Sequence, residues 1–335
     1  MCTEKKLRAA IVGCGTVSAN HIAAIKDCGK AELVALCDIN TDKAKASAEK
    51  YGLSVGIYES YEEMLENEDI DVIHITTPHY LHVPMAIAAL EKNINVFLEK
   101  PMAISKEEIE ALLEAEKKSS AKLTVCFQNR FNSTTVIAKQ IADEDGGALE
   151  CYASVFWQRN EKYYTESGWR GKYATEGGGV MINQAIHTID LLCFFLGIPR
   201  KVSATIANHH LKGVIEVEDS CGGRICFENG KIANFYATNA CISFDATTLF
   251  IKTKKHKIEI MTPARLYVDG KEINIEEHKS YVGKECYGVG HYKLISEFYN
   301  AIITGCDVPV SAESAQYALR ILLAAYNSFG EEVDV

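Results

Sequence analysis

LRAAIVGCGTVSANH, residues 7–21, decides the fold of the first part of the chain. The apolar run Leu7–Val12 is followed by Gly-x-Gly-x-x-Ser at 13–18, which predicts a strand, a tight glycine turn and a helix that continues to about Cys28. In a dinucleotide-binding fold the first glycine permits the turn, and the second lets a pyrophosphate approach the backbone at the helix N-terminus. Serine stands where a third glycine is expected, so the fingerprint is imperfect.

An acidic residue ends the next predicted strand, Glu32–Cys37. Asp38 lies 25 positions after Gly13, close to the spacing at which a dinucleotide fold places a carboxylate on the adenosine ribose. The same carboxylate would repel a 2′-phosphate, so we expect NAD as the cofactor and NADP to bind less well. The alternative is that Asp38 caps the helix predicted near Thr41–Tyr51.

Strands and helices alternate regularly to about residue 128. Further strands are predicted at 71–76, 95–98 and 123–127, separated by helices at 60–67, 81–92 and 105–120. This alternation predicts a parallel, doubly wound sheet, in which ligands bind beyond the carboxyl ends of the strands. Three strand ends carry polar groups: Thr76-Thr77-Pro78-His79, Glu99-Lys100-Pro101 and Gln128-Asn129-Arg130. Lys100 is therefore expected at the mouth of the cofactor crevice, although a lysine before a turn is also a common surface residue.

The pattern changes after about residue 130. A helix at 134–142 leads to a strand at 150–157, and strands follow near 202–207, 222–227, 232–238, 247–252, 258–260 and 273–275, before helices at 292–304 and 312–329. Turn signals such as Asn229-Gly230 indicate hairpins. We therefore predict an α/β chain with two domains: a Rossmann doubly wound parallel sheet in 1–128, and an α+β domain with a largely antiparallel sheet in 129–335.

A second stretch, EGGGVMINQAIHTIDLLCFFLG at 176–197, combines three glycines with a helical apolar run. On a helix, residues three and four apart share a face, so Asn183, His187 and Asp190 form one polar stripe on an apolar rod. Unsatisfied buried polar groups cost about 1–3 kcal/mol each, so such a stripe should line a cavity or bind something. The alternative is a core histidine that Asp190 satisfies.

The bulk composition excludes several classes of protein. The 335 residues carry a formal net charge of −10 without a basic cluster, which argues against nucleic acid or an anionic membrane as the main partner. The helix around His187 carries too many polar groups for a membrane span. The twelve cysteines are scattered without a C-x-x-C pair, and the N-terminus runs straight into a strand, so we expect a cytoplasmic protein without a metal site.

Four features together, GCGTVSANH, the strand end at Asp38, EKP at 99–101 and GGGVMINQAIHTID at 177–190, resemble the glucose-fructose oxidoreductase / inositol dehydrogenase / rhizopine catabolism (Gfo/Idh/MocA) family. Their order and spacing and the total length match, so the resemblance covers essentially the whole chain. It implies an NAD(P)-binding Rossmann domain, a second domain whose sheet often mediates oligomerisation, and substrates that are sugars, inositols or their derivatives.

The resemblance also implies site residues. The family's catalytic lysine and histidine correspond to Lys100 and His187, and Asp190 matches the family's second aspartate. Inositol dehydrogenases have an aspartate four residues before the histidine, where this chain has Asn183, which points toward other sugar-acting subgroups. We assign the cofactor contacts to Gly13, Gly15, Thr16, Val17, Asp38, Thr77, Pro78, His82, Glu99 and Lys100. We assign the substrate contacts to Lys100, Asn129, Arg130, Trp169, Arg170, Asn183 and His187.

Elementary chemistry fits these assignments. An imidazole titrates near pH ~6.5, so His187 can take the hydroxyl proton during a hydride transfer, with Asp190 holding its ring. Lys100 can stabilise negative charge on the substrate oxygen. Between Trp157 and Glu176, aromatic residues alternate with arginines. They suit a sugar ring and an anionic group, or equally an aromatic loop that packs against another domain or subunit.

The strand at 232–238 carries apolar residues on both faces, for example Phe235 and Tyr236, so we expect a homodimer or homotetramer. Two functions compete with a dehydrogenase. One is a redox-assisted glycoside-cleaving enzyme that recycles bound NAD, and the other is a non-catalytic dinucleotide-binding sensor. Retention of both Lys100 and His187 argues against the sensor.

Overall fold

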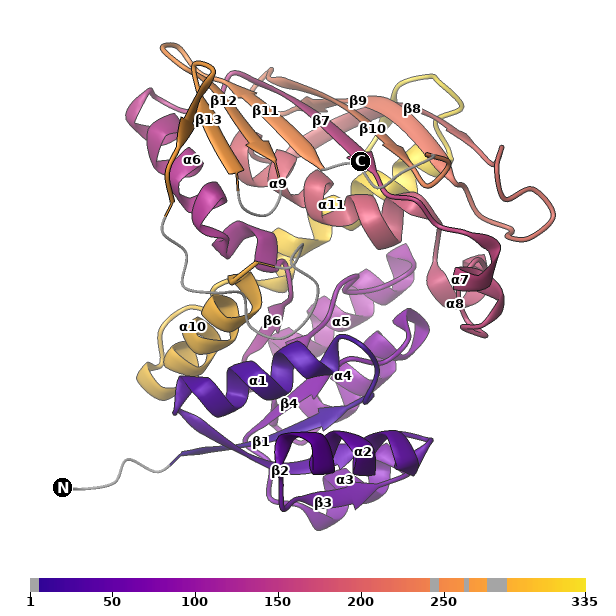
Figure 1. The fold of residues 1–335 in the computed structure, drawn as a ribbon, viewed down its shortest axis with the longest axis vertical. Coiled ribbons are helices and arrows are strands. Elements are labelled where there is room, and N and C mark those ends of the chain that lie inside the picture. Colours follow the sequence, from indigo (N-terminus) through magenta and orange to yellow (C-terminus); the bar gives the residue numbers. More distant parts are fainter. Residues whose placement is uncertain (1–5, 242–246, 262–264, 276–287) are drawn as a thin grey trace. The chain divides into compact units, whose positions relative to one another are not determined.

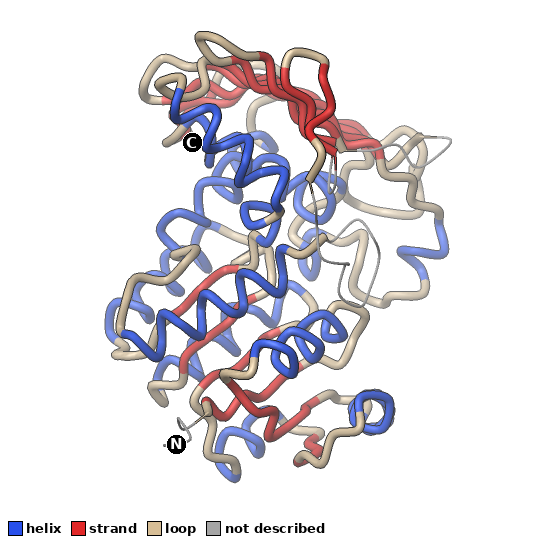
Figure 2. The backbone as a smooth tube through the Cα atoms, turned by 60° about the vertical axis from the view of Figure 1, so that its left-hand side comes forward, coloured by secondary structure: helices blue, strands red, loops and turns tan. Residues whose placement is uncertain are grey.

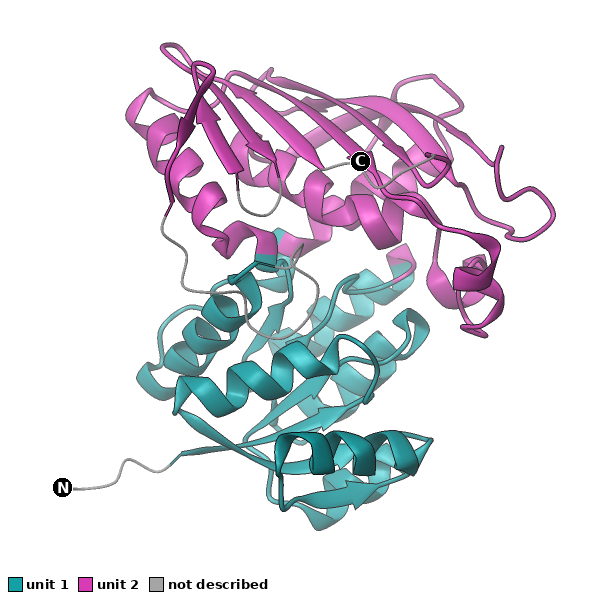
Figure 3. Cartoon of the chain, in the orientation of Figure 1, with its two compact units in different colours: residues 1–103, 107–128, 279–314 teal, residues 104–106, 129–278, 315–335 magenta. Residues whose placement is uncertain are grey.

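The fold is described from a computed structural model, which covers residues 6–241, 247–261, 265–275 and 288–335. The chain divides into two compact units, coloured separately in Figure 3. It passes from the first to the second at Gln128 and Asn129, but residues 288–314, which we assigned to the second domain, belong to the first unit. The physical reason is helix α10, Gly290–Thr304, which buries its apolar side against α1, Ser18–Cys28.

The first unit is built on a six-stranded sheet in the order β3-β2-β1-β4-β5-β6, with every pair parallel. Its strands are β1 Leu7–Val12, β2 Ala31–Cys37, β3 Gly56–Tyr58, β4 Val72–Ile75, β5 Asn95–Leu98 and β6 Leu123–Val125. This is the strand order of a doubly wound dinucleotide-binding fold. The predicted parallel sheet is thus confirmed, and the three-residue β3 is an addition that the sequence pattern did not reveal.

Helices connect these strands and pack on the sheet (Figures 1 and 2). They are α1, α2 Thr41–Tyr51, α3 Tyr61–Asn67, α4 His82–Glu91 and α5 Lys106–Lys118, with short 3₁₀ turns at His79–Leu81 and Gln128–Phe131. The central strands β4 and β5 are apolar and almost wholly buried, as expected for a sheet covered on both faces.

Gly13 is required where β1 turns towards α1. Its φ is +92°, and a β-carbon there would lie 2.7 Å from the backbone carbonyl carbon of Thr76 at the end of β4. An L side chain would therefore meet both backbone strain and a backbone clash. Gly15 is different, because a β-carbon there would have no protein atom within 4 Å. The open space beside Gly15 is what a ligand approaching this turn needs.

The second unit is built on a nine-stranded sheet in the order β14-β13-β12-β11-β7-β10-β9-β8-β15. Its strands are β7 Glu150–Phe156, β8 Pro199–Ala207, β9 Ser220–Phe227, β10 Ile232–Thr238, β11 Thr248–Lys252, β12 Lys257–Met261, β13 Arg265–Val268, β14 Lys271–Ile273 and β15 Val333–Asp334. Among the described strands of this sheet, β7 and β10 pair in parallel and the other pairs are antiparallel, so the prediction of a largely antiparallel sheet is confirmed. Strands β13 and β15 were not predicted.

Helices gather on one face of this sheet (Figure 2). Helix α6, Ser133–Glu144, packs against β12 and β13, and helix α9, Ile186–Leu196, packs against β7 and β10. The other described helices of this unit are α7 Glu161–Thr165, α8 Tyr173–Glu176 and α11 Ala312–Tyr326. Phe235 is buried at 6% exposure, whereas its neighbour Tyr236 is 46% exposed. Tyr152 on β7 and its cross-strand partner Phe250 on β11 are each 45% exposed. The sheet therefore carries apolar side chains on both faces, as the sequence indicates.

The segment Tyr173–Leu196 is long and apolar enough to cross a membrane by length and composition. However, 83% of its most apolar window is buried inside the protein. A core helix of a soluble protein passes the same test, so the segment is weak evidence for a membrane span.

The glycine turn gives a matched pair of substitutions. Gly13→Ala should lower the free energy of unfolding by about 2–4 kcal/mol, because it adds a backbone clash to an unfavourable φ. Gly15→Ala should change it by no more than about 0.5 kcal/mol, since open space surrounds the added methyl group. Chemical denaturation of the two variants measures the difference. Equal stabilities would contradict the close approach of β1 and β4.

The exposed aromatic side chains predict self-association through the sheet of the second unit. Light scattering at micromolar concentration should give a multiple of the 37.0 kDa chain mass. Tyr236→Glu should reduce that mass, because it places a charge among Tyr152 and Phe250. Phe329→Glu is the control, as Phe329 is 87% exposed but lies outside this sheet. A wild-type species of 37.0 kDa would refute the prediction.

Candidate active site

Asp38 is tied to the glycine turn. Its Oδ2 accepts the N–H of Cys14 at 2.8 Å, and its Oδ1 accepts the N–H of Asn40 at 2.9 Å. The alternative that Asp38 caps α2 is wrong, because Asn40 is the N-cap and its side chain accepts the N–H of Asp42. The half-buried carboxylate therefore stands beside the turn at the end of β2, where we expected the ribose contact.

The start of α1 is accessible to a ligand. Its N-cap, Val17, makes no side-chain cap hydrogen bond, and Gly15 and Thr16 are exposed. Ser18, in the place of the third glycine, donates from its hydroxyl to the Gly15 carbonyl at 2.7 Å, so the serine stabilises the turn. A pocket of about 390 Å³ adjoins the turn, lined by Gly15, Thr16, Ser18, Ala19, Ser47, Lys50 and Tyr51. These residues fit a dinucleotide, whose pyrophosphate needs open backbone N–H groups.

The end of β4 supports this turn from the other side. The hydroxyl of Thr76 donates to the carbonyl of Val12 at 3.0 Å, whereas Thr77 and Pro78 are half-buried and remain candidates for cofactor contact. We assigned His82 to the cofactor, but its side chain is buried at 1% exposure. Its ring nitrogens lie 2.7 Å from the Pro101 carbonyl oxygen and 3.0 Å from the Thr77 carbonyl oxygen. Its position indicates that it links two loops rather than contacting the cofactor.

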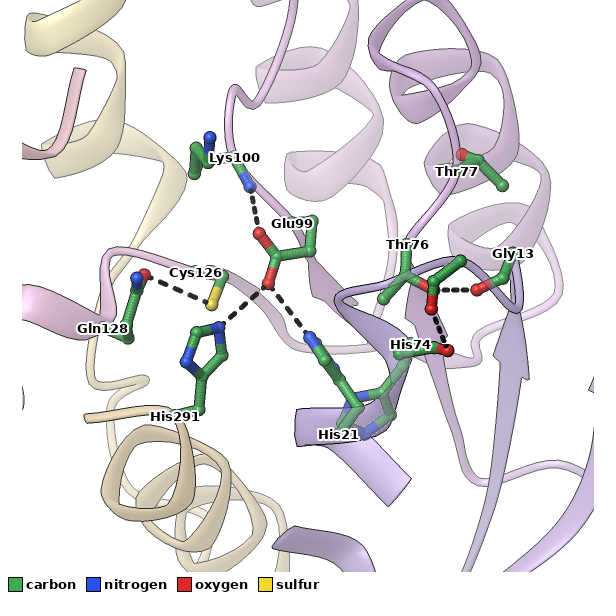
Figure 4. Close-up of polar contacts among 12 residues, drawn as sticks. Gly13, His21, His74, Thr76, Thr77, Glu99, Lys100, Cys126, Gln128 and His291 are labelled. Carbon is green, nitrogen blue, oxygen red and sulfur yellow. Dashed lines mark hydrogen bonds and ion pairs between the residues drawn. The ribbon is translucent and has the colours of Figure 1, made fainter. Parts of the chain in front are cut away.

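Glu99, at the end of β5, is also a supporting residue (Figure 4). It is 5% exposed, and its Oε1 lies 3.0 Å from His21 Nε2 and 3.4 Å from His291 Nε2. Its Oε2 accepts the backbone N–H of Lys100 at 3.2 Å. Burial alone would raise the pKa of Glu99, but its contacts with the two histidines together outweigh burial and hold the pKa well below its usual range. The carboxylate is therefore ionised and fixes the backbone that carries Lys100.

The histidine contact extends into a buried chain. His21 Nδ1 lies 2.9 Å from His74 Nδ1, and His74 Nε2 lies 2.7 Å from the hydroxyl of Tyr299. Burial lowers the pKa of both His21 and His74, so both rings are neutral near pH 7. One arrangement of protons then satisfies every contact: Tyr299 donates to His74, His74 donates to His21, and His21 donates to Glu99.

Four side chains of this region could hold a metal ion by residue type. The donor atoms of His21, Glu99, Cys126 and His291 all lie within 4.8 Å of one another, and all four residues are buried. We predicted no metal site, and this group was missed because its members are far apart in the sequence. Burial raises the pKa of the Cys126 thiol well above its usual range, which opposes the thiolate that a metal needs. The hydrogen bonds of Glu99 also account for this carboxylate without a metal.

In the second unit, a buried carboxylate holds the glycine turn. Glu218 accepts the N–H of Gly179 at 3.0 Å and the N–H of Met181 at 2.9 Å, and it also accepts the hydroxyl of Tyr326 at 2.8 Å. A β-carbon on Gly179 would collide with the Glu218 carbonyl, which explains why glycine is needed there. Sequence reasoning missed Glu218, since it lies 39 residues from the turn.

The predicted polar stripe is present in part. The segment begins with a π-helical turn, Met181–Ala185, before α9. Between Val180 and Cys193, Asn183 and His187 are half-buried and every other residue is buried. These two polar residues are therefore the partly accessible positions of this segment. Asp190, at 1% exposure, is buried.

The structure gives Asp190 a different partner from the one predicted. Its Oδ2 accepts from Arg130 Nε at 2.8 Å, and its Oδ1 accepts from Arg130 Nη2 at 2.6 Å. Burial raises the pKa of Asp190, and the guanidinium opposes that rise. Arg130, which we assigned to the substrate, thus serves a buried ion pair. Asn129 is likewise 8% exposed and lies 3.3 Å from the amide of Asn132, so a direct substrate contact by Asn129 or Arg130 is not supported.

Asn183 connects to a buried acid and an aromatic ring. Its amide donates to the carboxylate of Glu176 and, at 3.3 Å, to the hydroxyl of Tyr163. Burial raises the pKa of Glu176 to about 7. Trp169 and Arg170, which we assigned to the substrate, are half-buried in the loop beyond Tyr163. Tyr163 belongs to the aromatic loop that we considered for a sugar ring, whereas a role for Glu176 was not predicted.

Comparison with known proteins identifies a family whose models match both parts of the chain. Residues 7–127 match the model of an oxidoreductase family with an NAD-binding Rossmann fold, and residues 134–259 match the GFO/IDH/MocA C-terminal domain. The D-glucoside 3-dehydrogenase of Escherichia coli K12 is 30% identical over 96% of this chain and 95% of its own length. The inositol 2-dehydrogenase of Salmonella typhimurium is 32% identical, but the match spans only 41% of each protein.

A solved structure agrees over the full length. The WlbA dehydrogenase from Bordetella pertussis, in complex with NADH and UDP-GlcNAcA, superposes with a TM-score of 0.84 at 28% identity, covering 99% of both chains. The family matches span most of this chain, and the glycine turn and parallel sheet are those that the first match describes. The chain therefore belongs to the GFO/IDH/MocA family of oxidoreductases, and its first unit is an NAD-binding Rossmann domain.

Proposed function

We propose that the protein transfers a hydride between NAD and a hydroxyl or keto group of a sugar, a cyclitol or a sugar derivative. The observation that carries this proposal is the accessible pair Asn183 and His187 on an otherwise buried segment. Relatives named D-glucoside 3-dehydrogenase and inositol 2-dehydrogenase support a polyhydroxylated substrate. Asn183 offers a neutral hydrogen bond to a substrate hydroxyl beside the one that reacts.

The proposed chemistry divides between two side chains. When bound, NAD supplies the hydride chemistry at its nicotinamide ring. His187 takes the proton from the substrate hydroxyl in oxidation and returns it in reduction. Lys100 stabilises the negative charge that develops on the same oxygen, and Glu99 holds its backbone. Asp38 and the turn at Gly13 and Gly15 hold the cofactor.

Asp38 should determine the choice of cofactor. Asp38→Asn keeps an oxygen for the Cys14 N–H but removes the charge that repels a 2′-phosphate. The ratio of kcat/KM for NADP to that for NAD should rise by about tenfold or more, since one charged contact is worth roughly 1.4 kcal/mol or more. Steady-state kinetics with both cofactors measure this. An unchanged ratio, or a wild-type preference for NADP, would contradict the role of Asp38.

His187 and Lys100 should act on the same substrate oxygen. His187→Ala and Lys100→Ala should each lower kcat by about 10²-fold or more, the usual scale for losing a proton-transfer group or an oxyanion stabiliser. The double variant should lose less than the product of the single losses, because residues that act as a unit are non-additive. NADH binding, followed by fluorescence titration, should survive in His187→Ala. Near wild-type turnover in either single variant would remove that residue from the mechanism.

The same preparation separates the competing functions. A dehydrogenase reduces added NAD in the presence of its substrate. A glycoside-cleaving enzyme that recycles its cofactor would convert substrate without reducing added NAD, and a sensor would bind NADH without any turnover. Either of the last two results, obtained with a broad panel of sugars and cyclitols, would overturn the proposed reaction.

A further inference from the structure

Two arginines of the second unit stack on one tyrosine ring. The guanidinium carbons of Arg159 and Arg170 each lie 4.5 Å from the centre of the Tyr163 ring. Each arginine also lies over a tryptophan, Arg159 at 5.0 Å from Trp157 and Arg170 at 4.6 Å from Trp169. All five side chains are half-buried. The two guanidinium carbons therefore lie at most 9.0 Å apart, which is 4.5 Å plus 4.5 Å.

The protein supplies no anion to this pair within the described residues. Neither arginine forms an ion pair with a described carboxylate, and the Nε of each is buried without a hydrogen-bond acceptor. Within the part of the chain that the structure describes, Arg159 donates one side-chain hydrogen bond, from Nη1 to the Gln158 carbonyl at 3.0 Å. Two neighbouring cations with unused, buried N–H groups are electrostatically unfavourable unless an anion joins them.

Glu176 is the acid whose pKa Arg170 affects, but both of its carboxylate oxygens already accept hydrogen bonds. Its Oε2 accepts the N–H of Gly171 and its Oε1 accepts from the amide of Asn183. Arg170 lowers the pKa of Glu176, but burial acts more strongly and raises that pKa to about 7. Glu176 therefore carries only part of a negative charge near neutral pH and makes no ion pair with Arg170 within 4.0 Å.

The arginine pair adjoins the accessible polar groups of the site. The hydroxyl of Tyr163 accepts from the amide of Asn183 at 3.3 Å, so the tyrosine on which both arginines stack touches the segment that carries His187. Asn183 and His187 are four positions apart and both half-buried. The loop that carries the arginines and the segment that carries His187 therefore meet at Asn183.

We propose that Arg159 and Arg170 bind a carboxylate or phosphate group on the substrate, so that the enzyme acts on anionic sugar derivatives. The assignment rests on the proposed function only in taking the segment with His187 as the substrate site. A guanidinium suits such oxyanions because its planar fork donates two parallel hydrogen bonds. The tyrosine and tryptophan rings hold both guanidiniums in place before the anion arrives, which reduces the entropy cost of binding.

The test compares three probes that differ in charge: D-glucuronate, glucose 6-phosphate and D-glucose. Titration calorimetry with the NADH-loaded protein measures binding, and NAD reduction measures turnover. Binding of one charged probe should exceed that of D-glucose by about tenfold or more, as expected for a charge-assisted contact. A preference for glucuronate assigns the pair to a carboxylate, and a preference for the phosphate assigns it to a phosphoryl group.

The variants Arg159→Gln and Arg170→Gln should each weaken binding of the preferred charged probe by about tenfold and change D-glucose binding by less than about threefold. Arg170→Lys should recover part of the loss, since it restores charge without the fork. Arg224→Gln is the matched control, because Arg224 is exposed on β9 and contacts Asn234, so it removes a charge of the same unit elsewhere. Thermal unfolding of each variant verifies that it is folded.

The two proposals fail in different ways. Equal binding of charged and neutral probes, or charged-probe binding that Arg159→Gln and Arg170→Gln leave unchanged, would overturn the anion site. Arginine-dependent binding of a charged probe without any NAD reduction would support the anion site and count against the dehydrogenase. NAD reduction that is indifferent to charge would do the reverse. If a glutamine variant fails to fold, Arg170→Lys tests the anion site in its place. A folded Arg170→Lys variant with unchanged affinity for the charged probe would contradict binding by the planar guanidinium of Arg170.

Discussion

Three buried carboxylates hold the backbone on which the candidate active site depends. Glu99 fixes the start of the segment with Lys100, Glu218 holds the N–H groups of the turn before α9, and Glu176 holds Asn183. An unpaired buried carboxylate would cost several kcal/mol, so each is stable only when its hydrogen-bond donors stay in place. The backbone around each acid therefore has little freedom to shift. The segment with Lys100 and the polar segment with His187 therefore gain their rigidity from residues that need not touch any ligand.

The fold was largely predictable because its signals are local. The parallel sheet is predicted by apolar runs that alternate with helices. The turn at Gly13 is predicted by two glycines that are two positions apart, Gly13 and Gly15. The short strands β3, β13 and β15 were missed, because two to four residues are too few to show the alternation of apolar and polar residues that identifies a strand. The place of residues 288–314 was missed for a different reason, because the apolar face of α10 does not indicate which helix it covers.

The candidate site was predictable only in part. The spacing of Asn183 and His187 correctly indicated accessible positions, but it also suggested that Asp190 faces His187. Arg130, which lies 60 residues before Asp190, takes that carboxylate. Helical periodicity reports which residues share a side and not which distant residue meets them. For the same reason Glu218 was missed. Glu99 and His82 were assigned to the cofactor, but their side chains are buried and contact other parts of the protein.

The return of α10 to the first unit has a consequence for the order of synthesis. All six strands of the parallel sheet have been synthesised when residue 125 has been made, yet α10 begins only at Gly290. Until then Glu99 lacks His291, His74 lacks Tyr299, and the apolar side of α1 lacks its cover. We therefore expect the nascent cofactor domain to persist as an incomplete, aggregation-prone intermediate while the second unit is translated. A chaperone that shields α1 during this interval would assist the whole protein.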